Sequence, residues 1–440
     1  MMLLLIWDLD FFSTYNQNFT FITFEIFFPE FLLMSCILSL LFLKPQGFKV
    51  FHYNFWFFEL WKFSLLSLSI YSFLKLIQLQ RYSNFSLFLF NNYLFENDFN
   101  IIVKLILILC IIITLIFIFF YMITVNNNKI KLRVLFFLLF TIIFLFGLLM
   151  SFDLFGIYLC IEGLTLVLTT LISSNLTRIS IESGLKYSLL SAYSSCLLLL
   201  AISLFLFFFG TTNLLTLKIL INSFVLNSKL NFFFLSINVI FLKNINYLLL
   251  FFFLNLLFKL SAWPCCFWVP DIYAGTTMPV IFYFSTTLKL IFFFFVRFIF
   301  FTFFSYYYFL KTLLLIIAIG TSLFGVIGSL FQNKLKLFIG FSGIAHIGLL
   351  FFSLSSFNFI GVFSAIFYLV FYTISSFILF GLILNINLVS YHKIWGIKHF
   401  NILYLSDLRG IYLKQKLFGL ILIFIFFFFI WSSSISEFFW

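Results

Sequence analysis

Charged side chains are scarce in this sequence. Lys, Arg, Asp and Glu make up 9% of the 440 residues, while hydrophobic residues make up 64%. Soluble globular domains carry about 25% charged residues, so this composition excludes a soluble fold. The mean hydropathy of +1.23 agrees. The class that remains is a membrane protein that crosses the bilayer several times.

The sequence also lacks the residue patterns that hold redox or nucleotide cofactors. The adjacent pair Cys265 and Cys266 is badly arranged for ligating one metal ion jointly. The other cysteines lie mostly in apolar runs, at positions 36, 110, 160 and 196, where cysteine acts as a small hydrophobic residue. Dinucleotide fingerprints, P-loops and four-cysteine motifs are missing. We therefore expect no flavin, iron–sulfur cluster, nucleotide or other cofactor in this chain.

Long apolar runs are abundant instead. Each is long enough to cross a bilayer as a helix, and each is continuously apolar and not alternating, which disfavours a β-barrel. The predicted fold class is an all-α polytopic membrane protein with about twelve transmembrane helices. The predicted helices cover 21–44, 54–78, 100–124, 132–150, 153–174, 184–209, 246–263, 276–304, 308–331, 335–356, 359–387 and 413–431.

Composition also indicates the setting of the protein. The 79 Phe residues, with much Ile, Leu and Asn and little Pro, are typical of a very T-rich genome and favour an organellar gene. The net charge of +12 comes from Lys and Arg residues that flank the predicted spans, mostly in alternate loops. This is the positive-inside pattern, it places the N-terminus outside, and it does not indicate nucleic-acid binding. The first apolar run contains Asp8 and Asp10 and does not resemble a cleavable presequence.

Three charged residues lie deep in predicted spans. Glu162 is near the middle of span 153–174, Lys259 is deep in span 246–263, and Lys289 lies about 15 Å along a helix from Pro279. Ionisable groups inside a bilayer are costly and usually face the protein interior or a water-filled path. An acid and several lysines are what a proton relay requires, provided that neighbouring groups switch the charge of each lysine. The alternative is an ion pair between Glu162 and a lysine that ties helices together.

Two further residues, Lys186 and His346, have two interpretations each, and a third, Arg297, has one. Lys186 is close to a helix start, where it either joins the relay or reaches the headgroups along its stem. His346 is central in its helix and is either a proton carrier or a hydrogen-bonded packing residue. Arg297 lies two helical turns beyond Lys289 and is expected to reach the headgroups.

Pro264 predicts a break in a transmembrane helix. Proline has no N–H, and its ring collides with the carbonyl group of Leu260, so the helix should break or kink beside Lys259. Freed backbone groups are tolerated in a membrane only where they face protein or water. Discontinuous helices next to a charge are typical of ion-translocation sites. We expect the break to admit water to Lys259.

Four segments carry motifs of one family. FKLSAWPCCFWVPDIYAG (258–275) matches K-L-x-x-x-P-F-H-x-W-x-P-D-V-Y-x-G-A-P, and ESGLKYSLLSAYSS (182–195) matches E-A-A-L-K-Y-F-L-L-G-A-x-S-S. KLKLFIGFSGIAHIGLLFFSL (334–354) and AIFYLVFYTISSFILFGLIL (365–384) match two consecutive helices. The sequence thus resembles the antiporter-like membrane subunits of proton-pumping NADH:ubiquinone oxidoreductase, respiratory complex I. The turn GTTNL (210–214) resembles the subunit 2 branch.

The resemblance implies an antiporter-like fold with a broken seventh helix. Residues 1–125 would form three N-terminal helices, 126–305 the first antiporter-like repeat, and 306–440 an incomplete second inverted repeat that ends in a partial twelfth helix.

The resemblance also implies a function in the mitochondrial inner membrane. Protons would move along a hydrated axis, driven by quinone reduction elsewhere in the complex, and this chain would hold no redox site. Its partners would be the other membrane-arm subunits of complex I and the surrounding lipid, with no nucleic acid. The residues that match the family's proton-carrying positions are Glu162, Lys186, Lys259, Lys289 and His346.

Three departures from the family pattern raise alternatives. Cys266 replaces a histidine, and the segment 274–277 lacks a carboxylate and a proline. The chain stops at Trp440, with Glu437 near the place of a lysine in the family's twelfth helix. We therefore expect a separate polypeptide to supply the missing C-terminal helices. The alternative functions are a cation/proton antiporter subunit and a structural membrane-arm spacer that does not conduct.

Overall fold

A computed structural model describes part of the chain, and that part falls in two compact units, Met1–Ile112 and Ile113–Trp440, which are treated separately. The predicted spans 21–44, 54–78 and 413–431 lie outside the described residues, apart from isolated positions. The described residues are 70, 72, 87–89, 94–96, 98–124, 128–230, 249–302, 307–393, 404–408 and 420.

The described part of the first unit contains a short β-hairpin and the start of a helix. Strand β1 (Leu87–Leu89) pairs antiparallel with β2 (Leu94–Glu96), and Phe88 lies opposite Phe95. Helix α4 (Asp98–Thr124) follows and runs across the boundary between the units. The hairpin was not predicted, because its apolar residues read as ordinary parts of a hydrophobic sequence.

The elements of the second unit in its described part are all helices, apart from two isolated β-bridges. A short apolar helix, Leu249–Leu260, precedes α10 in the chain. The other elements are α5 (Asn128–Met150), α6 (Leu154–Ile172), η2 (Ser173–Asn175), α7 (Arg178–Phe209), α8 (Leu214–Leu230), α10 (Trp268–Gly275), α11 (Met278–Thr286), η4 (Leu288–Leu290), α12 (Ile291–Thr302), α13 (Tyr307–Leu330), α14 (Leu335–Leu354), α15 (Phe359–Lys393) and η6 (Leu405–Leu408).

Eight helices in the described residues are long and apolar enough to cross a membrane. They confirm the predicted membrane class and match eight predicted spans to within a few residues, whereas the predicted span 246–263 is present as the shorter helix Leu249–Leu260. The eight are Phe99–Ile118, Arg133–Met150, Leu154–Asn175, Arg178–Phe209, Met278–Ile299, Phe309–Leu330, Leu335–Leu354 and Ile360–Ile383.

Local sequence signals set the ends of the helices. Thr177 and Ser180 form a capping box at the start of α7, where each side chain accepts from the other's backbone N–H. Gly210 closes the same helix in the left-handed region, at φ 69°, which glycine adopts without strain. Pro279 lies in the first turn of α11, where its missing N–H costs nothing.

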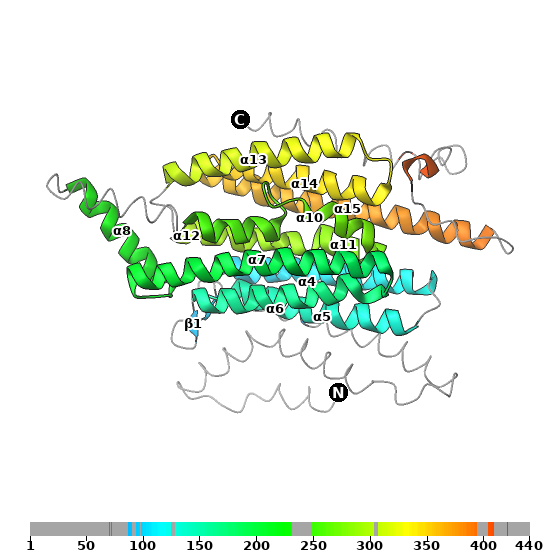
Figure 1. Ribbon diagram of the computed structural model, residues 1–440, viewed down its shortest axis with the longest axis horizontal. Coiled ribbons are helices and arrows are strands. Elements are labelled where there is room, and N and C mark those ends of the chain that lie inside the picture. The colour runs from blue at the N-terminus through cyan, green and yellow to red at the C-terminus, as the bar shows by residue number, and fades with distance from the viewer. Residues whose placement is uncertain are drawn as a thin grey trace, which may run out of the picture. The chain divides into compact units, whose positions relative to one another are not determined.

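Within the second unit, α10, the helix that follows Pro264, packs between two groups of helices. Helix α10 contacts both α7 and α14, while α5, α6 and α7 pack in sequence on one side and α13, α14 and α15 on the other (Figure 1). The span Met278–Ile299, formed by α11, η4 and α12, is enclosed. Every residue of its most apolar stretch is buried, whereas only 28% of the residues are buried in the corresponding stretch of Phe309–Leu330 in α13. Polar residues on the enclosed span therefore face protein.

Candidate functional site

The helix that carries Lys259 breaks, as Pro264 predicted. The helix ends at Leu260, and α10 begins only at Trp268. Ser261 adopts a φ of 58°, a left-handed conformation that strains a residue with a side chain. The chain therefore turns sharply two residues after Lys259 and leaves this lysine at a helix end inside the protein.

The carbonyl groups freed by the break find donors within the protein. The oxygen of Phe258 accepts from the backbone N–H of Ser261 and, at 3.1 Å, from the indole N–H of Trp268. The hydroxyl of Ser261 donates to the carbonyl oxygen of Leu260 at 2.6 Å. Since an unsatisfied backbone group inside a membrane costs several kcal/mol, these bonds stabilise the break.

Lys259 itself is buried and finds no such partner. It is 8% exposed, and its Nζ has no hydrogen bond to any described residue. The rings of Phe258 and Tyr187 lie 5.4 and 6.0 Å from Nζ, within the range of cation–π attraction. One turn earlier on the same helix face, Asn255 is fully buried, and neither polar atom of its side chain has a described partner. Buried polar groups of this kind are the ones that ordered water usually satisfies.

Glu162 lies half-buried near the middle of α6. Its Oε2 accepts a hydrogen bond from the hydroxyl of Thr165 at 2.8 Å. Its charge interacts with Lys259 and with Tyr187. Within the described part of the chain, neither salt bridge present includes Glu162. Glu162 and Lys259 therefore influence each other across a gap and do not form a direct tie.

Lys186 points to different carboxylates. Its Nζ lies 3.1 Å from Glu182 on its own helix and 3.2 Å from Asp271 on α10, and its side chain is half-exposed. The sequence left open whether Lys186 or Lys259 interacts with Glu162 at rest. In this structure Lys186 is paired with Glu182 and Asp271, and it connects α7 to the broken segment.

Lys289 is held at the most irregular point of the enclosed span. It lies in the 3₁₀ turn η4, is 7% exposed, and donates to the carbonyl of Gly343 at 2.9 Å and to the hydroxyl of Tyr372 at 2.6 Å. The Tyr372 ring centroid is 4.0 Å from Nζ. Three separate elements, η4, α14 and α15, thus meet at one nitrogen, which confirms that Lys289 is an interior residue.

His346 belongs to the same cluster. It is 4% exposed, its Nδ1 lies 2.6 Å from the hydroxyl of Tyr368, and its ring centroid is 4.8 Å from that of Tyr372. Because Tyr368 and Tyr372 are one turn apart on α15, a single helix face presents hydroxyls to both His346 and Lys289. Four titratable side chains, Lys289, His346, Tyr368 and Tyr372, therefore lie side by side.

Arg297 differs from its expected placement. It is half-buried on α12, donates to the carbonyl of Leu149, and lies over the ring of Phe152, 5.3 Å from its centroid. The last carbonyl groups of α5 have no partner within the helix, so this arginine supplies a donor there. Its interior position was missed because a guanidinium near a span end usually reaches water.

Sequence reasoning missed Tyr368, Tyr372 and Asn255. The two tyrosines are spaced i, i+4 in FYLVFY, a signal that a face-by-face reading of the helix would have detected. Asn255 is a lone amide in an apolar run and gave no pattern. In the described residues no three His, Cys, Asp or Glu side chains gather where they could hold a metal ion.

The site residues thus form two polar centres in the described part of the chain. One contains Glu162, Lys259 and Asn255 around the helix break, with Lys186 at its margin. The other contains Lys289, His346 and the two tyrosines of α15. Each combines titratable side chains with neutral hydrogen-bonding groups, the combination that stepwise proton transfer requires.

Two solved structures share the fold of this chain. A chain of respiratory complex I from Thermus thermophilus superimposes with a TM-score of 0.62 at 19% identity, covering 89% of this chain and 76% of that one. A chain of an archaeal membrane-bound sulfane sulfur reductase gives 0.64 at 16% identity, covering 83% and 71%. At such identities the likeness shows the fold alone.

Sequence comparisons give the family. NADH-quinone oxidoreductase subunit N of Pelagibacter ubique is 32% identical over 219 residues, 49% of this chain and 43% of that protein. NADH-ubiquinone oxidoreductase chain 2 of Rhizopus oryzae is 30% identical over 290 residues, 64% and 51% respectively. The chain therefore spans about half the length of these relatives. The family model of the NADH:quinone oxidoreductase/Mrp antiporter transmembrane region matches residues 151–428, and with more than half of its length matched this chain belongs to that family.

Proposed function

We propose that this chain is a proton-translocating subunit in the membrane arm of a mitochondrial NADH:ubiquinone oxidoreductase. The family assignment and relatives named NADH-ubiquinone oxidoreductase chain 2, from Rhizopus oryzae and Marchantia polymorpha, support the complex. The Phe-rich composition supports an organellar gene and hence the mitochondrial inner membrane. The partners would be the other membrane-arm subunits.

One observation carries the proposal. Lys259 lies buried at a helix break, and its Nζ has no described hydrogen-bond partner. A lysine kept only for structure would be expected to have acceptors, because an uncompensated buried cation costs several kcal/mol. A lysine that gains and loses a proton has to spend part of its cycle neutral, and a site with weak cation–π contacts and a carboxylate at a distance suits that alternation.

The proposed roles follow from the two polar centres. Glu162 would set the charge of Lys259, and Lys186 would respond to the broken segment through Asp271. Lys289 and His346 would form the second proton-carrying centre. The chain would contribute no redox centre and would be catalytic only within the complex. The division at 125/126 and 305/306 stays a prediction.

The test replaces the two groups of the first centre in the assembled complex. In Lys259→Met and Glu162→Gln variants we expect proton uptake per quinone reduced to fall, and the quinone-reduction rate to drop about tenfold or more, since a positioned proton carrier is lost. Lys311→Met, an exposed lysine at the start of α13, is the matched control and should behave as wild type. If proton uptake per quinone reduced stays at the wild-type value in both variants, the chain is a structural spacer that does not conduct protons.

The family description itself favours a second candidate. It covers Mrp antiporters as well as NADH:quinone oxidoreductases, so a cation/proton antiporter subunit is the alternative. Exchange of Na⁺ for protons across vesicles, without NADH or quinone, would distinguish it. We expect no such exchange.

A further inference from the structure

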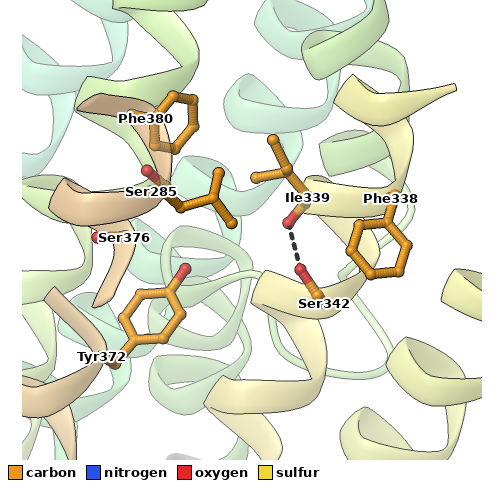
Figure 2. A pocket seen from close by; sticks show the side chains of 8 residues that line it. Ser285, Phe338, Ile339, Ser342, Tyr372, Ser376 and Phe380 are labelled. Carbon is orange, nitrogen blue, oxygen red and sulfur yellow. Dashed lines mark hydrogen bonds between the residues drawn. The ribbon is translucent and has the colours of Figure 1, made fainter. Parts of the chain in front are cut away.

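A small pocket adjoins Lys289 on the side of Tyr372. It lies between α11, α14 and α15; the surface that faces it is mostly apolar, and Ser285, Ser342, Ser376 and Tyr372 are among the residues that line it. Figure 2 shows the Tyr372 hydroxyl directed into the space between the serine-bearing helices. The pocket was not suggested by the sequence, because its hydroxyls come from segments far apart in the chain.

The serine hydroxyls of this pocket have their protons engaged. Ser285 donates to the carbonyl of Phe282 at 2.9 Å, and Ser342 donates to that of Ile339 at 3.0 Å. Ser376 donates in the same way to a carbonyl one turn back, at 2.8 Å. A carbonyl only accepts, so each serine oxygen offers lone pairs to the pocket. The polar lining contributed by the serines is therefore made of acceptors, and a molecule bound there has to donate hydrogen bonds.

Tyr372 connects that lining to Lys289. The ammonium group of Lys289 only donates, so the Tyr372 oxygen is the acceptor of the 2.6 Å bond. Its own O–H is then the donor toward another group, and Figure 2 shows this hydroxyl at the pocket. A molecule in the pocket that accepted from Tyr372 and donated to a serine oxygen would extend the order of donors and acceptors that begins at Lys289.

We propose that this pocket binds water and that Tyr372 passes protons between Lys289 and that water. In the transfer, a Lys289 N–H proton moves to the Tyr372 oxygen while the phenolic proton leaves to the water. Lysine becomes neutral, tyrosine stays neutral, and the charge departs as hydronium. The step reverses when Lys289 is recharged. The inference rests on the proposed function and adds Tyr372 as a proton-carrying residue.

The test removes single hydroxyls from the assembled complex in vesicles. Tyr372→Phe keeps the ring over Lys289 and removes only the O–H, and Ser342→Ala with Ser376→Ala removes two pocket acceptors. We expect proton uptake to slow about tenfold with Tyr372→Phe, and less with the serine pair. The rate in D₂O should fall more than in wild type because proton transfer becomes limiting. Tyr283→Phe, a buried phenol bonded to Thr141, and Ser375→Ala, which is bonded to the backbone oxygen of Tyr372, are the matched controls.

Each outcome decides the proposal. Wild-type uptake and isotope effect in Tyr372→Phe would overturn it, while reduced uptake in Lys259→Met would leave the proposed function standing. Should Tyr372→Phe fail to assemble, the serine pair decides on its own: wild-type behaviour overturns the pocket. A wild-type rate that depends on Na⁺ concentration would show that a cation, and not water, occupies it.

Discussion

Lys289 shows how one residue is positioned by three elements. Its ammonium nitrogen touches the Gly343 carbonyl on α14 and the Tyr372 hydroxyl on α15, while the 3₁₀ turn that carries it interrupts the regular helix. A Cβ on Gly343 would lie 2.9 Å from Nζ and 3.5 Å from the Tyr372 hydroxyl. Glycine at this position therefore leaves the room that the lysine head occupies.

We predict that Gly343→Ala lowers proton uptake without unfolding the protein. The added methyl group meets the flexible end of Lys289, so the ammonium group shifts at small cost in stability and loses its alignment with Tyr372. Uptake by the complex should fall several-fold, about tenfold at most. Gly381→Ala, where nothing lies within 4 Å of the new Cβ, is the control. Wild-type proton uptake in Gly343→Ala would contradict the claim that uptake depends on the alignment of Lys289 with Tyr372.

At the scale of elements, α13 and α14 are joined by glycine contacts. A Cβ on Gly325 of α13 would come within 2.3 Å of the backbone nitrogen of Ala345, and one on Gly348 of α14 within 2.6 Å of that of Ser322. Neither backbone can move aside as a side-chain end can. Small residues let transmembrane helices approach closely and gain dispersion contacts. This contact fixes α14, the helix that carries Gly343 and His346.

We predict that Gly325→Ala destabilises the protein. The methyl group forces α13 and α14 apart, which costs about 1–3 kcal/mol as overpacking. Thermal unfolding of the detergent-solubilised complex, or the yield of assembled complex, measures the loss. Gly381→Ala should be neutral or stabilising by up to about 1 kcal/mol, because alanine favours a helix. Equal stability of the two variants would show that the glycine contact is unimportant.

The elements also show what the sequence could predict. Pro264 predicted the helix break because proline acts on its own helix, through a missing donor and a local clash. Hydropathy predicted the eight spans for the same reason: each needs only its own composition. The partners of the charged residues could not be predicted. Lys186 meets Asp271 across 85 residues and Lys289 meets Tyr372 across 83, and such pairs depend on helix packing.

At the scale of the whole molecule, the described residues keep costly polar groups at two interior centres of the second unit. One surrounds Lys259 at the helix break and the other surrounds Lys289. A membrane protein retains such groups where they serve transport or pair with one another. Lys289 has direct acceptors, whereas Lys259 and Asn255 have none among the described residues. If protons reach Lys259, they arrive through water.

The most direct measurement is a density map of the assembled complex, at a resolution that shows ordered water. We predict water within hydrogen-bonding distance of Lys259 Nζ and the Asn255 side chain, and water in the pocket beside Tyr372. The contrary result is a dry interior in which a carboxylate contacts Lys259 directly and apolar side chains fill the Tyr372 pocket. In that case the buried lysines are structural, and protons do not pass through this chain.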